Sequence, residues 1–175
     1  MPGSERPALK NDFSHALCTA WESALAPVAK NSNIRLCIAR FGVVLSGDGG
    51  AFVQMSLPFK AKLAVQNGDG KQWFSWIALD DAISALAFLV NNKTAQGTFN
   101  IVAPNPFTNA MLTQLMAKHY NTLITLPAPA GVLRLVMGQM ADELLLASLR
   151  VLPKQLQDHG FEFKYTDFAL WLKSL

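Results

Sequence analysis

Two side chains near the start of the chain have the types and the spacing that acid–base chemistry requires. Cys18 and Glu22 lie four residues apart in a segment whose apolar residues recur with helical spacing, so both project from one face of a helix. A thiol and a carboxyl group on one face could transfer a proton. The alternative is a buried, reduced Cys18 beside a Glu22 that faces solvent.

A second group of residues could contact a ligand. Arg40, Phe41 and Gly42 belong to an almost uninterrupted apolar run, and open α/β sheets present ligand-binding residues beyond the carboxyl ends of their strands. Arg40 is therefore a candidate ligand contact, and a structural ion pair is the equal alternative. The turn that contains Gly49 and Gly50 could hold an anion through exposed backbone N–H groups, or it could be a plain surface turn.

The segment 71–81 (KQWFSWIALDD) adds polar and aromatic candidates. Gln72 and Ser75 supply hydrogen-bonding groups, while Trp73 and Trp76 supply flat apolar area with one N–H each. Strand alternation places Gln72 and Trp76 on one face and Trp73 and Ser75 on the other. We expect one tryptophan to be in the core, and we predict that Trp76 lines a pocket.

The other titratable residues favour structural roles. Asp80 and Asp81 are adjacent, so their side chains point apart, and one of them is predicted to cap the following helix. The three histidines have no metal-ligand spacing with each other or with a cysteine, so no metal site is predicted.

The elements that must position these residues alternate between strands and helices, which indicates an α/β protein. Periodicity and capping signals predict helices over 13–30, 51–59, 80–91, 108–120, 132–140, a short one from 153, and 166–175. Strand-like runs cover 34–44, 71–79, 97–103, 123–126 and 161–165. A buried parallel strand needs neighbours on both sides and helices on both faces. The apolar content is high for so few strands, so we expect part of the surface to face more protein.

Composition limits the class of protein. The 175 residues are 51% hydrophobic and 15% charged, and the net charge of +3 comes from scattered lysines and arginines. Because phosphate-backbone binding needs a basic stripe or cluster, no nucleic-acid partner is expected. The sequence shows no signal segment and no apolar run of roughly 18 to 20 residues, so a cytoplasmic protein without a membrane span is expected. Cys18 and Cys37 lack CxxC spacing, and reduced, buried thiols are predicted.

Five segments resemble one protein family in sequence, order and approximate spacing. They are DFSHALCTAWESAL (12–25), RLCIARFGVVLSGDGGAFVQMSLPF (35–59), GDGKQWFSWIALDDAISAL (68–86), GTFNIVAPNPFTN (97–109) and MADELLLASLRVLPKQLQDHGFEFKY (140–165). The family is the NAD(P)-dependent epimerase/dehydratase-like branch of the extended or atypical short-chain dehydrogenase/reductases. Its members end in a small domain of unknown function.

The resemblance implies the C-terminal part of a Rossmann-like α/β fold with a small α+β substrate lobe and without the first Rossmann half. Residues 1–120 then belong to an epimerase-like domain, and 121–175 form the small C-terminal domain. Arg40, Phe41 and Gly42 would lie against the nicotinamide ribose of NAD or NADP. Gly49, Gly50, Gln72, Ser75 and Trp76 would line the substrate pocket.

The chain also departs from the family pattern. A Gly-rich strand–turn–helix motif is missing, since neither Gly47–Gly50 nor Gly68–Gly70 has G-x-G-x-x-G spacing. Cys18 and Glu22 stand where relatives carry a Tyr-x-x-x-Lys pair. Phe74 and Ala78 replace an arginine that contacts phosphate and a histidine.

Two functions stay open at this point. One is the substrate-binding side of a truncated nucleoside-diphosphate-sugar epimerase-like protein that is inactive alone and binds no cofactor by itself. The other is a non-catalytic module that binds a dinucleotide or a protein. In either case we expect a small-molecule substrate as a possible ligand, and self-association or a missing N-terminal half as the partner.

Overall fold

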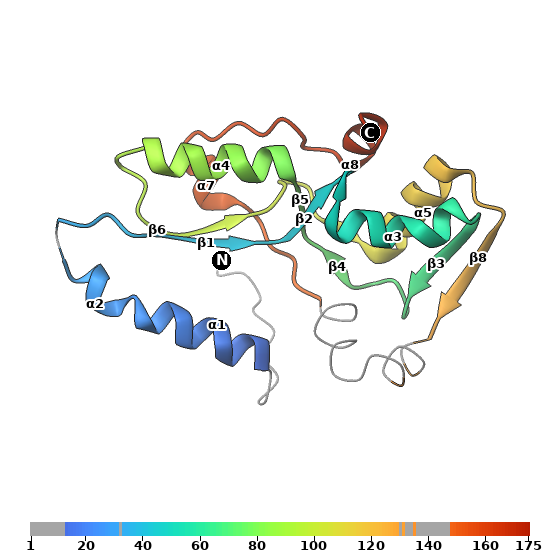
Figure 1. Cartoon of the computed structure of the whole chain (residues 1–175), viewed down its shortest axis with the longest axis horizontal. Coiled ribbons are helices and arrows are strands. Elements are labelled where there is room, and N and C mark those ends of the chain that lie inside the picture. The colour runs from blue at the N-terminus through green and yellow to red at the C-terminus, as the bar shows by residue number, and fades with distance from the viewer. Residues whose placement is uncertain (1–12, 32, 130, 132–134, 136–147) are drawn as a thin grey trace.

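Parallel strands connected by helices form the framework of the chain (Figure 1). The computed structural model describes residues 13–31, 33–129, 131, 135 and 148–175. The predicted α/β class is confirmed. The helix predicted over 132–140 falls largely outside the described residues. Among the helices that the structure describes, none is both long enough and apolar enough to cross a membrane.

The first helical segment is two helices instead of one. Helix α1 spans Phe13–Ala24 and α2 spans Ala26–Ala29, with a proline in the first turn of α2. Proline has no backbone N–H and is tolerated at the start of a helix but not within one. Pro27 therefore explains why the predicted helix is divided after Ala24.

The apolar run that follows is also divided. Strand β1 spans Cys37–Phe41 and β2 spans Val43–Ser46. Helix α3, Gly50–Lys60, begins after a tight turn, and β3, Leu63–Asn67, follows it. The strand predicted over 71–79 consists of β4, Trp73–Phe74, and β5, Trp76–Ala78.

Helix α4 spans Leu79–Asn91, and Ala78 occupies its N-cap position without a side-chain bond. The prediction of an aspartate cap is therefore wrong, because Asp80 and Asp81 lie inside the first turn. Strand β6, Gly97–Ile101, and the short β7, Phe107–Thr108, precede α5, Asn109–Tyr120. Thr108 caps α5, as predicted, by accepting a hydrogen bond from the Met111 N–H.

The C-terminal part contains β8, Ile124–Ala128, then α7, Lys154–Asp158, and α8, Phe168–Lys173. The strand predicted over 161–165 is wrong, because those residues have no strand partner among the described elements. Their backbone bonds to a side chain instead: Asp81 accepts from the N–H groups of Lys164 and Tyr165.

The strands pair as four two-stranded units. β1 pairs in parallel with β6, β2 with β5 and β3 with β8, while β4 and β7 are antiparallel. In Figure 1, α4 and α8 lie on one side of the β1, β6, β2 and β5 strands, and α1 and α2 lie on the other. Strand β1 has no second neighbour among the described strands, and its residues are half-buried or exposed.

Two apolar clusters form the core. The first joins α3, α5 and α8 around Trp76, and the second joins α4, β6 and α7 around Phe99. Aromatic rings dominate the first cluster, where Trp76 contacts Phe107, Phe168 and Trp171 at centroid distances of 5.2 to 6.3 Å. Neither cluster includes a described residue of α1 or α2.

Candidate functional site

Gly42 marks the point where the chain leaves one strand partner and joins another. Its N–H donates to the carbonyl of Ile101 (3.2 Å), and the N–H of Val43 donates to the carbonyl of Ser75 (2.9 Å). A Cβ atom at Gly42 would lie 2.6 Å from that Ser75 oxygen. The close backbone approach therefore requires glycine. The switch places Gly42 at the carboxyl end of β1, where open α/β sheets bind ligands.

Arg40 forms an ion pair with Glu22 of α1. The Arg40 Nε donates to Glu22 Oε1 (2.7 Å) and a terminal nitrogen donates to Oε2 (2.5 Å). This bidentate contact lowers the pKa of Glu22 from its ordinary value, chiefly through the hydrogen bond to Arg40. Glu22 is therefore ionised at neutral pH and cannot supply a proton.

Cys18 and Glu22 do not form an acid–base pair in the structure. The thiol of Cys18 is exposed and free, so the expectation of a buried Cys18 is wrong. Glu22 forms an ion pair with Arg40, so the expectation of a Glu22 that contacts only solvent is also wrong. Cys37 is half-buried, and its thiol donates to the carbonyl of Ala95 at 3.2 Å.

Ser75 holds the C-terminal segment against the strands. Its hydroxyl donates to the carbonyl of Leu149 (2.9 Å) and accepts from the N–H of Val151 (3.2 Å). Nearby, the Ser148 hydroxyl accepts from the N–H of Trp73 (3.1 Å). Because the Ser75 hydroxyl both donates and accepts a hydrogen bond within this segment, its role in this structure is to position residues 148–151.

Arg150 lies in the segment that Ser75 holds, and the sequence analysis did not identify it. Its guanidinium carbon lies 5.0 Å from the centroid of the Trp73 ring, which is a cation–π contact. Within the described part of the chain Arg150 has no carboxylate partner. No local spacing reveals this pair, since 77 positions separate the two residues in the sequence. Strand alternation did predict that Trp73 and Ser75 share a face, and both contact this segment.

Trp76 and Gln72 do not belong to the group of residues around Gly42, Ser75 and Arg150. Trp76 is 1% exposed and belongs to the aromatic core. Of the two tryptophans, the pocket-lining role predicted for Trp76 fits the half-buried Trp73 better. Gln72 is 8% exposed, and its amide donates to the carbonyl of Asn67 at the end of β3.

Gly49 follows the turn between β2 and α3, and Gly50 is the first residue of α3. Bridges join Leu45 to Gly50 and Ser46 to Gly49. Gly50 has a φ of 68°, a conformation that favours glycine, while Gly49 is extended. A Cβ atom at either glycine would meet nothing within 4 Å. The predicted site residues thus divide into Arg40, Phe41, Gly42 and Ser75, which the strand switch brings together, and Gly49, Gly50, Gln72 and Trp76, which lie elsewhere.

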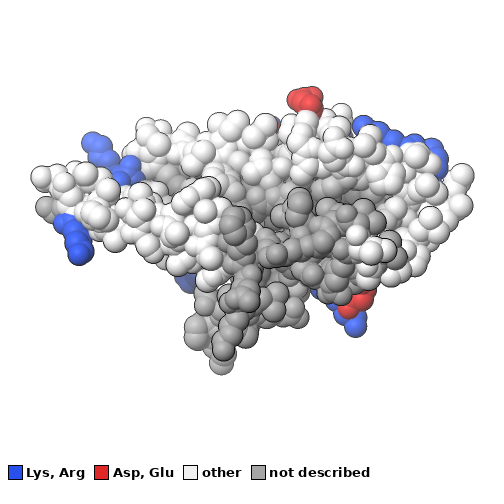
Figure 2. Space-filling model, turned by 60° about the horizontal axis from the view of Figure 1, so that its bottom comes forward, with Lys and Arg blue, Asp and Glu red and all other residues white. Residues whose placement is uncertain are grey.

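The described residues do not fit a dinucleotide pyrophosphate or a metal ion by themselves. The Ser75 carbonyl occupies the space beside Gly42. Strand β1, which ends before Gly42, leads into β2 and not into a helix. Among the described residues, no group of three or more His, Cys, Asp or Glu side chains could hold a metal ion. Figure 2 shows the described Lys and Arg side chains of one face at separate places and not as one continuous patch.

Known protein families and sequences are similar to this chain. A domain of unknown function (DUF1731) matches residues 128–175. An epimerase family protein of Staphylococcus aureus (strain N315) is 37% identical over 164 residues, which are 94% of this chain and 54% of that protein. A Staphylococcus epidermidis relative has the same identity and coverage.

Two solved structures share the fold. The human epimerase family protein SDR39U1 (isoform 2), solved with NADPH, aligns with a TM-score of 0.87 and 30% identity over 97% of this chain and 57% of that one. The nucleoside-diphosphate sugar epimerase of Corynebacterium glutamicum aligns with a TM-score of 0.73 and 33% identity, over 96% of this chain and 31% of that one.

The chain has a Rossmann-like α/β fold similar to that of these epimerase structures. The chain matches the C-terminal part of the epimerase family proteins, which confirms the resemblance found in the sequence. It spans about half the length of the curated relatives that it matches.

Proposed function

We propose that the chain forms the substrate-binding side of an NAD(P)-dependent epimerase-like protein that takes a nucleoside-diphosphate sugar. The observation that carries this proposal is the arrangement around Gly42. Arg40 precedes the switch, and the Ser75 hydroxyl holds the segment that contains Arg150 beside it. Guanidinium groups suit phosphate oxygens, because they offer several N–H donors in one plane.

In this proposal Arg150 supplies the phosphate contact that Phe74 cannot make. Trp73 supports the guanidinium from one side, and the exposed remainder of Arg150 is free to meet an anion. The dinucleotide is held mainly by protein corresponding to the half of the relatives that this chain does not span. We therefore propose that the chain alone does not turn over substrate.

The exposed surface of α1 and β1 supports the same proposal. Trp21 on α1 is 66% exposed and Phe41 on β1 is 45% exposed. Strand β1 also lacks a second neighbour among the described strands. An unpaired parallel strand beside exposed aromatic side chains is typical of a surface that packs against more protein. We propose that the rest of the epimerase fold covers it.

A non-catalytic binding module is the second candidate, and Glu22 favours it. This carboxylate stands where relatives carry a catalytic pair, yet Arg40 keeps it ionised. A chimera would distinguish the two functions: this chain joined to the part of the S. aureus relative that it does not span, assayed for UDP-glucose turnover with NAD(P). Turnover supports the first function, and binding without turnover supports the second.

Replacement of Arg150 tests the substrate side directly. We expect Arg150→Ala to weaken binding of UDP-glucose to the chimera by roughly ten- to a hundredfold, because a charged hydrogen bond is lost. Lys118→Ala, a matched loss of an exposed cation on α5, should leave affinity unchanged. Isothermal titration calorimetry gives both affinities. Equal affinity of the Arg150→Ala and unaltered chimeras would contradict the assignment.

A further inference from the structure

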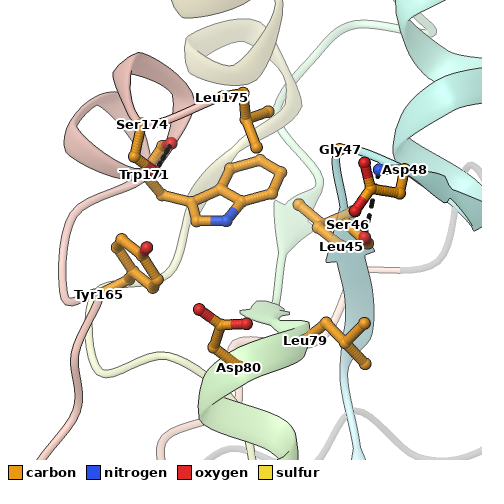
Figure 3. A pocket seen from close by; sticks show the side chains of 10 residues that line it. All are labelled: Leu45, Ser46, Gly47, Asp48, Leu79, Asp80, Tyr165, Trp171, Ser174 and Leu175. Atoms are coloured by element: carbon orange, nitrogen blue, oxygen red, sulfur yellow. Dashed lines mark hydrogen bonds between the residues drawn. The ribbon is translucent and has the colours of Figure 1, made fainter.

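A cavity of about 230 Å³ is lined by residues that include none of Arg40, Glu22 and Gly42. It is formed by the turn after β2, the start of α4 and the C-terminal segment that includes α8 (Figure 3). This volume is below the roughly 300–1,000 Å³ that drug-sized ligands occupy. A ligand at this position must therefore be small.

Trp171 presents a hydrogen-bond donor to this cavity. The residue is 4% exposed, and its ring is held by Phe52 at 5.0 Å and by Phe168 at 5.5 Å between centroids. Figure 3 shows the indole nitrogen directed into the space between Tyr165, Asp80 and Ser46. Among the residues that the structure describes, none accepts a hydrogen bond from it. This nitrogen is not among the fully buried, unpartnered side-chain atoms of the described residues, so it is accessible from the cavity.

Two carboxylates face the same space. Asp80 uses Oδ2 to accept from the Lys164 ammonium (2.8 Å), and its other oxygen remains available at the cavity. Asp48 lines the opposite wall, where its own N–H donates to the Ser46 hydroxyl (3.3 Å). The walls between these polar groups include Leu45 and Leu79.

These groups restrict the chemistry of the occupant. The Trp171 N–H can only donate a hydrogen bond, while ionised carboxylates can only accept one. An organic cation would match Asp48 and Asp80 but leave the indole N–H without an acceptor. An anion would match the indole N–H but would be repelled by the carboxylates. Hydroxyl groups both accept and donate, and they carry no charge.

We propose that this cavity binds a small neutral polyhydroxyl compound of monosaccharide size. One hydroxyl oxygen accepts from the Trp171 N–H, and neighbouring hydroxyls donate to Asp48 and Asp80. The C–H groups of the ligand contact Leu45 and Leu79. This site is separate from the surface around Gly42, so it does not depend on the function proposed for that surface.

The indole N–H resonances of the ¹⁵N-labelled 175-residue chain test this proposal. Titration with D-glucose or myo-inositol should produce a saturable shift of the Trp171 Nε1–H signal, while the Trp73 signal stays unchanged. Asp48→Ala and Asp80→Ala should each weaken the binding by at least roughly tenfold. The control is Asp158→Ala, which removes another aspartate paired with a lysine (Lys154) but lies outside the cavity and should bind normally.

Charged probes complete the experiment. Methylammonium and acetate should leave the Trp171 signal unchanged, and a saturable shift with either one would overturn the proposal. The proposal also fails if neither D-glucose nor myo-inositol shifts the signal. A shift that persists in Asp48→Ala and Asp80→Ala would overturn it equally. Trp171→Phe keeps an aromatic ring in the core and should abolish the binding, which can be followed by calorimetry.

Discussion

Gly42 shows how one residue determines the path of the chain at the candidate site. The strands on either side of it have different partners, and the Ser75 carbonyl occupies the space that a side chain would need. Asp81 has a comparable role at the other end of β5. It is 1% exposed and accepts from two backbone N–H groups of the C-terminal segment. Gly42 permits a close backbone contact, and Asp81 provides hydrogen-bond acceptors for backbone N–H groups.

Substitution of Gly42 should therefore be costly. Gly42→Ala places a methyl group 2.6 Å from the Ser75 oxygen and 2.8 Å from Val102 Cγ1. We expect the free energy of unfolding to fall by about 1–3 kcal/mol, as for other overpacked sites. Urea denaturation followed by circular dichroism measures this change.

Gly49→Ala is the matched control for Gly42→Ala. Gly49 has an extended backbone, and an added Cβ would meet nothing within 4 Å. Its free energy of unfolding should change by less than about 0.5 kcal/mol. Equal stability of the two variants would show that the close approach at Gly42 is relaxed in solution.

At the scale of elements, the contact between α1 and β1 depends on charge. The pKa of Glu22 is lowered in the folded chain, so its contribution to stability is complete above its ordinary pKa of 4.5. That contribution is lost as the pH falls through the folded-state pKa. Arg40 and Glu22 side chains are 55% and 28% exposed, which limits the contribution of the pair to below about 1 kcal/mol.

Glu22→Gln should reproduce this loss. At neutral pH we expect the variant to be slightly less stable than the unaltered chain, and we expect the difference to disappear when the pH falls well below 4.5. Urea unfolding curves across this pH range measure the difference. Glu162→Gln changes an exposed carboxylate distant in sequence from α1 and should show no such dependence. A constant difference for Glu22→Gln at every pH would contradict the ion-pair assignment.

Most elements could be predicted from the sequence because their signals are local. Thr108 caps α5 by its own side chain, and Pro153 precedes a short helix as expected. The break at Gly42 could not be predicted, because the residues on both sides are apolar and the change of strand partner is a tertiary event. The segment 161–165 alternates like a strand, but the Asp81 side chain satisfies its backbone instead.

The candidate site was predicted only in part, for the same reason. Arg40 and Gly42 follow from the rule that ligands bind at the carboxyl ends of parallel strands, and Ser75 was predicted as a polar group of the segment 71–81. Arg150 reaches the site through a contact with Trp73, and no spacing encodes that contact. Trp76 is a type of residue that often lines pockets, but three aromatic side chains pack around it.

At the scale of the whole molecule, the exposed surface of α1 and β1 is the main feature. Trp21 and Phe41 are both exposed there, and the described strands leave one edge of β1 unpaired. Apolar side chains beside an unpaired strand edge favour association. We expect the isolated chain to form dimers or larger species in light scattering, increasingly so at higher concentration. A monodisperse monomer at all concentrations would contradict this expectation.

Cofactor binding tests the central claim most directly. The measurement is a titration of NADPH, followed by quenching of tryptophan fluorescence, with the isolated chain and with the chimera that adds the part of the S. aureus relative not spanned by this chain. We predict saturable quenching for the chimera and no saturable quenching for the chain alone. Saturable binding of NADPH to the isolated chain, or none to a folded chimera, would contradict the claim that this chain is the substrate side of an NAD(P)-dependent epimerase-like protein.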